Sequence, residues 1–419
     1  MNDPAWIDGA LNAARPQAMG ALLRWFRDLD AAEEAFQEAS LRAVRTWPQN
    51  GPPRDPAAWL VFVGRNAGVD AARRRQKLTA LPGEAAISDL DDAEADAAER
   101  LDGADYRDDI LRLLFVCAHP ELKATEQVAL ALRIVSGLSV KQVARAFLVS
   151  ESAMEQRITR AKRRIAQAGL SYEVPGAVER AERVAAVAAV IYLVFNEGYS
   201  AGFDAQERRA PLCDEAIRLG RLLLRLFPSE PEIMGLLALM LLQHSRAAAR
   251  FDAEGTVVLL DAQDRRLWTR PAIDEGLTLL DKAMRHRAPG PYQAQAAIAA
   301  LHARAPSAED TDWAQIERLY AALERMEPSP VVTLNRAVAL GKAQGWSEAL
   351  DLVEPLADRL DGYFHFHGVR GWLLSRLGRR REAREAWNRA VALAATPAEA
   401  AHIRAQIDAL EAEPRPSAA

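Results

Sequence analysis

Basic and amide side chains gather between residues 156 and 164, and their chemistry suits contact with a nucleic acid. An arginine guanidinium can pair bidentately with guanine, a glutamine amide can pair with adenine, and any cation neutralises phosphate. Side chains of these types recur here at helical steps: Gln156, Arg157, Arg160, Arg163 and Arg164. The spacing therefore predicts a helix with one exposed basic face.

This basic face belongs to the second of two short predicted helices. Ser139 is a good N-cap with Gln142 at the reciprocal position of a capping box, and the first helix is expected to end near Phe147. Ser150 can cap the second helix, whose apolar stripe consists of Met154, Ile158, Ala161 and Ile165. Two such helices joined by a tight turn predict a helix-turn-helix that enters a DNA major groove. A solvated basic helix in an ordinary bundle fits the same spacing, so earlier segments decide between the two.

An acidic helix and a helix with a basic end are predicted between residues 30 and 77. Asp30 can cap the first with Glu33 at the reciprocal position, and Pro48 with the glycine-proline cluster after it is expected to stop that helix. Asp55 as cap and Pro56 at the first helical position begin the second. The first helix exposes Glu33, Glu34, Gln37 and Glu38, and the second carries Asn66, Asp70, Arg73, Arg74 and Lys77. Plain solvated surface is the alternative for each of these charged faces.

Two segments of these helices carry a family-specific pattern. Residues 32–39 read AEEAFQEA, and residues 58–75 read AWLVFVGRNAGVDAARRR. An acidic helix ending in Gln-Glu, then Trp-Leu, Arg-Asn, an Asp and an arginine run, resembles conserved region 2 of extracytoplasmic-function sigma factors. The helix-turn-helix at 137–165 is similar to region 4 of the same family. Two motifs in the right order are far more specific than either motif alone.

The resemblance implies surfaces for RNA polymerase core, through its β′ clamp and β flap, and for promoter DNA. The positions that would face the β′ clamp are Glu33, Glu34, Gln37 and Glu38. The positions that would hold the melted −10 element, with a flipped base at the first, are Asn66, Asp70, Arg73 and Arg74. The positions that would contact the −35 element are Ser152, Gln156, Arg157, Arg160 and Lys162.

Two positions depart from the family pattern, and two aromatic residues are ambiguous. Gly64 replaces the usual small residue before Arg-Asn and is expected to loosen the helix. Glu155 lies where many relatives carry a basic residue, so base preference should differ from the family norm. Trp59 and Phe62 can act as stacking platforms for bases, but their helical spacing favours a place in the core.

Composition predicts an all-α protein of several domains. The chain has 419 residues, half of them apolar, with few aromatic residues and a net charge of −5, so DNA binding must come from local patches. Only Cys117 and Cys213 occur, without metal spacing, which fits a reducing compartment. The N-terminus has no secretion pattern, and the longest apolar run, Val184 to Phe195, is too short to span a bilayer. A cytoplasmic protein without membrane contact is expected.

The expected division of the chain is a region 2 domain, an acidic linker, a region 4 helix-turn-helix domain, a helical extension domain and a set of helical repeats. Their ranges are 1–77, 78–106, 107–174, 175–285 and 286–413. The linker is poor in apolar residues, and both a solvated tether and a mimic of nucleic acid in the RNA exit channel remain open.

The extension begins with a predicted apolar helix from Val178 to Phe195, for which Gly198 is a plausible C-cap. Further helices are expected around 210–226 and 230–249, and an ordered polar loop is expected at 261–268.

An internal repeat lies near the end of the chain. An offset of 34 residues, the tetratricopeptide period, relates Val338, Glu348, Ala349 and Val353 to Trp372, Glu382, Ala383 and Trp387. Residues 277–284, 292–304 and 313–326 are similar to degenerate copies. A protein or peptide partner would bind the concave surface of such repeats. His365 and His367 lack a third partner for a metal, so no metal site is predicted.

The whole arrangement resembles a subgroup of extracytoplasmic-function sigma factors with a long C-terminal extension ending in tetratricopeptide repeats. That resemblance implies that the extension regulates the factor in cis. The candidate contact residues are polar or aromatic positions beside apolar helices: Asn196, Glu197, Tyr199, Asp261, Asp264, Arg265 and Trp268.

The leading interpretation is a promoter-specificity subunit of bacterial RNA polymerase, without catalytic residues, cofactor or metal. A DNA-binding regulator that never joins polymerase, with repeats that dock a partner, is the alternative. An enzyme using Glu197, Asp261 and Asp264 is disfavoured, because their spacing fits no acid/base pair. No phosphate loop or nucleophile elbow occurs in the sequence.

Overall fold

The computed structural model describes residues 5–51, 53–76, 103–147, 149–168, 177–199, 203–252, 255–394 and 396–412. Within these ranges every regular element is a helix, and Phe251 and Val257 form an isolated bridge. The predicted all-α class is therefore confirmed. The chain divides into two compact units, Met1–Val194 and Phe195–Ala419. None of the described helices is long and apolar enough to cross a membrane. Most of the predicted acidic linker lies outside the described residues.

The first unit begins with three mutually packed helices, α1 (Ala5–Phe26), α2 (Leu29–Asn50) and α3 (Pro56–Gln76). Asp55 caps α3 as predicted, since its carboxylate accepts from the backbone N–H groups of the second and third residues after it. The cap predicted for α2 is wrong. Its N-cap is Asp28, which accepts from the Ala31 N–H, and Pro48 lies inside the last turn. A proline there removes a backbone hydrogen bond but does not end the helix. The helix ends two residues later, at the predicted glycine-proline cluster, with Gly51 as its C-cap.

Gly64 permits the close approach of the first three helices and does not loosen α3, which is continuous. A Cβ at this position would lie 3.0 Å from the Ala35 carbonyl oxygen of α2 and 3.2 Å from a methyl of Leu22 in α1. The predicted effect of this glycine was therefore wrong. Its missing side chain brings α3 close enough to bury the faces of all three helices.

After α3, the first unit contains α5 (Gly103–Cys117), α6 (Ala124–Ile134), α7 (Val140–Ala146) and α8 (Glu151–Gln167), and it extends to Val194 in the helix that follows. The α7–α8 pair is the predicted helix-turn-helix. Ser139 and Gln142 form the capping box of α7, and Phe147 ends it. Ser150 caps α8 by accepting from the Ala153 N–H. These predictions are confirmed. Caps and helix stripes can be predicted from the sequence because they depend on residues only a few positions apart.

The next helix, α9 (Ala177–Tyr199), is continuous through the predicted C-cap at Gly198, so that prediction is wrong. It is followed by α10 (Phe203–Leu226) and α11 (Pro231–His244). The predicted ordered loop follows, with short 3₁₀ turns at Leu260–Ala262 and Arg265–Leu267.

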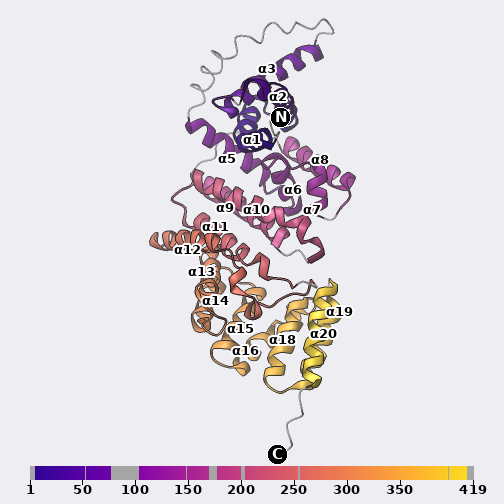
Figure 1. Cartoon of the computed structure of the whole chain (residues 1–419), viewed down its shortest axis with the longest axis vertical. Coiled ribbons are helices and arrows are strands. Elements are labelled where there is room, and N and C mark those ends of the chain that lie inside the picture. The colour runs from indigo at the N-terminus through magenta and orange to yellow at the C-terminus, as the bar shows by residue number, and fades with distance from the viewer. Residues whose placement is uncertain are drawn as a thin grey trace, which may run out of the picture. The chain divides into compact units, whose positions relative to one another are not determined.

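The remaining helices of the second unit pack in succession, each against its neighbours (Figure 1). They are α12 (Arg270–Arg285), α13 (Pro291–Arg304), α14 (Trp313–Met326), α15 (Pro330–Ala343), α16 (Trp346–Val353), α17 (Ala357–Leu360), α18 (Phe364–Arg376), α19 (Arg380–Leu393) and α20 (Pro397–Ala412).

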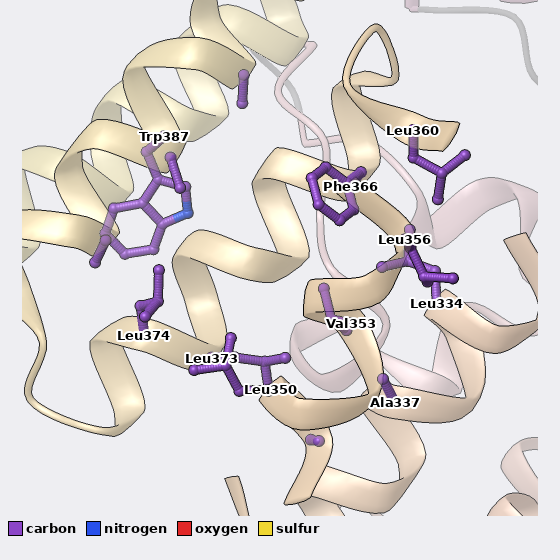
Figure 2. Close-up of a cluster of buried hydrophobic side chains, with 14 of the residues drawn as sticks. Leu334, Ala337, Leu350, Val353, Leu356, Leu360, Phe366, Leu373, Leu374 and Trp387 are labelled. Atoms are coloured by element: carbon purple, nitrogen blue, oxygen red, sulfur yellow. The ribbon is translucent and has the colours of Figure 1, made fainter. Parts of the chain in front are cut away.

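The 34-residue offset relates the pair α15–α16 to the pair α18–α19. The related apolar positions Ala349 and Val353, Ala383 and Trp387 share one core. Val353 and its counterpart Trp387 are buried in the same apolar cluster (Figure 2). From the first pair to the second, the side chain grows from Val353 to Trp387, whereas the position that faces it becomes smaller, from Ala337 to Gly371. A Cβ at Gly371 would lie 2.4 Å from the Trp387 ring. The second pair therefore accommodates a larger side chain by removing a methyl group opposite it.

Candidate polymerase and nucleic-acid interface

Helix α8 separates a buried face from an exposed one. Its stripe of Met154, Ile158, Ala161 and Ile165 is buried. Among the predicted DNA contacts, Arg157 is half-buried, and the exposed ones are Ser152, Gln156 and Arg160. Glu155 is exposed on the same helix, which places an acid among these donors. The exposed set can read guanine and adenine edges or clamp phosphates, as required of a recognition helix.

Lys162 differs from the other predicted DNA contacts because carboxylates of α2 surround it. Its ammonium lies 2.6 Å from Asp30 and 2.7 Å from Glu33, and only 16% of its side chain is exposed. Burial alone would lower the pKa of Lys162, but hydrogen bonds from its ammonium to both carboxylates raise the pKa above the usual value. In this structure Lys162 therefore faces α2.

The predicted polymerase-binding residues of α2 also divide into exposed residues and one covered residue. Glu34, Gln37 and Glu38 are exposed, and the same face continues to the exposed apolar residues Leu41 and Val44. An apolar strip bordered by charges is typical of a protein-binding surface.

Glu33 is buried, contrary to the exposed position expected for it. Its carboxylate lies 2.5 Å from the Arg133 guanidinium and 2.7 Å from Lys162. Sequence periodicity placed Glu33 at the edge of the acidic face and could not show that α6 and α8 cover that edge.

The predicted −10 surface on α3 is described in part. Asn66 is exposed, while the side chains of Asp70, Arg73 and Arg74 lie outside the described residues. Beside Asn66, the Arg65 guanidinium lies 3.6 Å from the ring centroid of Trp25, which is 52% exposed.

The sequence interpretation missed Trp25, although a tryptophan at the end of an apolar helix is a detectable signal. Its exposed ring, with a guanidinium beside it, is suited to stacking an unpaired base. Trp59, by contrast, packs with Trp47 at 5.4 Å between ring centroids, in the apolar cluster that includes Trp6. Its predicted preference for the core is confirmed.

Tyr199 and the candidate contact residues of the polar loop have partners inside the second unit. The Tyr199 ring lies 4.0 Å from the Arg250 guanidinium, which also donates to the Tyr199 carbonyl. Burial lowers the pKa of Arg250 below its usual value. Asn196 and Glu197 are half-buried on the same helix turn.

The polar loop 261–268 is fixed to two helices of the same unit. Asp261 pairs with Lys342 of α15 at 2.6 Å. Arg265 donates to the carbonyls of His302 and Ala305, and its guanidinium lies over the ring of buried Trp268. Trp268 therefore has a core role that the sequence did not indicate.

Asp264 stays at the surface of this loop. It caps the Arg265–Leu267 turn by accepting from the Arg266 N–H, and it pairs with the Arg266 guanidinium, which holds the pKa of Asp264 at about 2. Among the described residues, no group of three or more His, Cys, Asp or Glu side chains is arranged to hold a metal ion.

Comparison with known proteins identifies three segments of the chain. Residues 11–78 match Sigma-70 region 2, residues 112–165 match Sigma-70 region 4, and residues 183–284 match a family of unknown function, DUF6596. An uncharacterized protein of Rhizobium meliloti (strain 1021), R00370, is 69% identical over 414 residues, which cover 99% of this chain and 98% of that protein. The region 2 match covers the acidic face of α2 and the Asn66 surface, and the region 4 match covers the helix-turn-helix. The chain thus belongs to the same family as R00370, and it is a sigma-70-type protein in which regions 2 and 4 are followed by a helical extension.

Proposed function

We propose that this chain directs core RNA polymerase to specific promoters: α2 binds the β′ clamp, α3 holds the melted −10 element, and α8 reads the −35 element while the β flap holds region 4. The observation that carries the proposal is the division of α8 into a buried stripe and an exposed face with Gln156 and Arg160, in one unit with a region 2 match. The protein acts by positioning and by electrostatic contact, without covalent chemistry.

The exposed face of α2 supports the polymerase part of the proposal. Glu34 and Glu38 supply negative charge, and Leu41 and Val44, which are 56% and 50% exposed, supply apolar area. Desolvated apolar area gives such interfaces affinity, and the charged rim gives them orientation and association rate.

A charge reversal with a matched control tests core binding. Glu38→Lys in the full-length protein should weaken binding to bacterial core polymerase, whereas Asp8→Lys, at an exposed acid of α1, should leave it unchanged. Transcription start sites mapped after overexpression then supply promoters for in vitro transcription. A wild-type protein that binds promoter DNA but never binds core would overturn the proposal and support a separate DNA-binding regulator.

We further propose that the extension modulates this activity in cis. An extension acts on the sigma domains only if its contacts differ between polymerase-competent and incompetent arrangements. The candidate contacts named above, from Asn196 to Trp268, and a protein or peptide partner of the C-terminal helix pairs are parts of this proposal. The similarity of those pairs to tetratricopeptide repeats supports the partner.

Truncation after Pro175 tests the role of the extension. We expect in vitro transcription from a mapped promoter to fall when truncated and full-length proteins are compared at equal soluble concentration. Equal activity would show that the extension does not act in cis under these conditions.

A further inference from the structure

Four charged side chains from the two sigma regions form an interdomain charge cluster. Asp30 and Glu33 come from α2, Arg133 comes from α6 and Lys162 comes from α8. We infer that this cluster holds regions 2 and 4 in a closed arrangement, in which a polymerase-binding acid and a DNA-binding lysine bind each other instead of their partners. The inference rests on the proposed function, because it assigns a regulatory state to the same surfaces.

The burial of the cluster distinguishes it from ordinary surface ion pairs. The exposed side-chain fractions are 7% for Glu33, 16% for Lys162 and 19% for Arg133, whereas Asp30 is 73% exposed. Shielded charges are strongly unfavourable without a partner, so Glu33 and its two cations depend on one another. Arg133 is held further by a hydrogen bond from its guanidinium to the Leu138 carbonyl.

A second contact between the regions fixes their register. The buried Arg15 of α1 donates to the carbonyl of Ile134 at 3.0 Å and to that of Arg133 at 3.2 Å. These carbonyls lie at the C-terminal end of α6, where the helix dipole favours a cation. The Arg15 guanidinium also lies 4.6 Å from the Phe36 ring centroid. Burial lowers the pKa of Arg15 to about 10, and the opposite charge of Glu33 partly offsets that shift.

Two glycines allow the regions to approach closely, so their fit depends on shape as well as on charge. Gly137 has φ +77°, and a Cβ there would lie 2.8 Å from Cδ of Arg15. Gly20 of α1 lies against the backbone of Asp109 in α5, where a Cβ would be 2.6 Å from the carbonyl oxygen. Contacts of three kinds, an ion cluster, a helix C-terminus capped by arginine and a glycine-mediated approach, therefore specify one docked geometry.

In this docked geometry, one residue of each proposed binding surface is covered. Glu33 cannot face a polymerase clamp while Arg133 and Lys162 contact its carboxylate, and Lys162 cannot reach DNA while α2 carboxylates contact its ammonium. Opening must precede full engagement, so the apparent affinity for core falls with the open fraction. If about nine-tenths of the molecules are closed, the apparent Kd rises about tenfold.

The first measurement follows the distance between the regions in the full-length protein without polymerase. Fluorophores are attached at Leu41→Cys in α2 and Thr159→Cys in α8, both exposed positions. The natural cysteines are buried, and burial raises their pKa to about 12. Transfer efficiency is compared for the wild type, Arg133→Glu, the conservative Arg133→Lys, and Arg45→Glu, a charge control at an exposed arginine of α2.

We expect high transfer efficiency for the wild type, Arg133→Lys and Arg45→Glu, and a longer distance for Arg133→Glu. Asp30→Lys, at the exposed member of the cluster, should shift the distance in the same direction and serves if Arg133→Glu fails to fold. A wild type that is already open, or folded reversal variants with the wild-type distance, would overturn the inference.

The second measurement is binding of core polymerase by the unlabelled proteins. Arg133→Glu should bind core more tightly than the wild type, by up to about tenfold for a mostly closed wild type. Equal core affinity of the wild type and an opened variant would overturn the occlusion while leaving the proposed function intact. Absence of core binding by every variant, with the distance change present, would instead overturn the proposed function.

Discussion

The carboxylate of Glu33 and the ammonium group of Lys162 lie 2.7 Å apart, although 129 positions separate them in the chain. Arg133 approaches the same carboxylate at 2.5 Å from a third helix. One of the four residues predicted to bind polymerase is thus covered by helices of region 4. Two acids, Asp30 and Glu33, contact the same lysine, Lys162.

Glu33→Ala should weaken the region 2–region 4 contact far more than Asp30→Ala. Removing one partner of a buried ion pair costs about 3–5 kcal/mol, whereas an exposed pair contributes about 0–1 kcal/mol. Glu33 is buried and Asp30 is exposed, while each lies within 2.7 Å of Lys162. The fluorophore distance between α2 and α8 measures the effect. If the two variants opened equally, burial would not be what stabilises the contact.

Arg160→Ala should weaken DNA binding by about 1–3 kcal/mol and relax specificity at one base if its guanidinium contacts a base edge. A phosphate contact would instead weaken binding to all sequences and reduce the salt slope by about one. Arg160 is exposed on α8, and Arg157 is half-buried beside it, so we expect the larger effect at Arg160. Promoter-fragment binding across a salt series separates these cases. No effect at either arginine would leave Gln156 and Lys162 as the readers.

Asn66→Ala should impair promoter melting more than it impairs binding of core polymerase. The amide is exposed at the end of the well-packed part of α3 and can satisfy the Watson–Crick edge of a flipped base. Permanganate footprinting measures melting, and a core-binding assay measures the other step. Asn12→Ala, at an exposed asparagine of α1, is the control. Melting at the wild-type level in Asn66→Ala would exclude this role.

Gly371→Ala should destabilise the second unit, because the added Cβ would lie 2.4 Å from the Trp387 ring. Overpacking of this kind costs about 1–3 kcal/mol. The double variant Gly371→Ala, Trp387→Val reproduces the Ala337 and Val353 combination of the preceding pair. It should be less destabilised than the sum of the single variants, and urea unfolding of all four proteins measures the coupling. Additive effects would mean that the two positions do not compensate each other.

The stability of the second unit should fall as the pH drops from about 6.5 to about 4. Burial, with the nearby charges of Arg246 and Arg265, lowers the pKa of His302 from 6.5 to about 4. The unfolded state therefore binds the additional proton in this window, and stability is fully present above it. Because the ring is only half-buried, we expect a loss of about 1–2 kcal/mol, below the full value of the shift.

Comparison with a His302→Gln variant isolates this contribution. The control is needed because burial also lowers the pKa of His365 and His402. Urea unfolding at several pH values should show a smaller loss in the variant. The same pH dependence in both proteins would assign the effect to other groups.

The sequence alone was sufficient where the determinants are local. The caps at Ser139 and Ser150 and the buried stripe from Met154 to Ile165 depend on neighbours within about one or two helical turns. The all-α class followed in the same way, from composition and helical periodicity. The predictions that failed at helix ends are the caps at Asp30 and Gly198, because neighbouring side chains compete as caps and tertiary packing extends a helix. The glycine-proline cluster does end α2 as predicted, although Pro48 itself lies inside the last turn.

Only the tertiary structure decided which exposed-looking residues are covered. Nothing in the local pattern distinguishes Glu33 from Glu34 or Lys162 from Arg163, because each pair lies at the border of the same helix face. The Glu33–Lys162 pair and the bond from Arg15 to the Ile134 carbonyl join segments more than 100 positions apart. Likewise, the need for glycine at positions 64 and 371 is explained only when the facing helix is in place. Periodicity specifies which side of a helix is apolar, but the partner that covers its edge is chosen by packing and charge between distant segments.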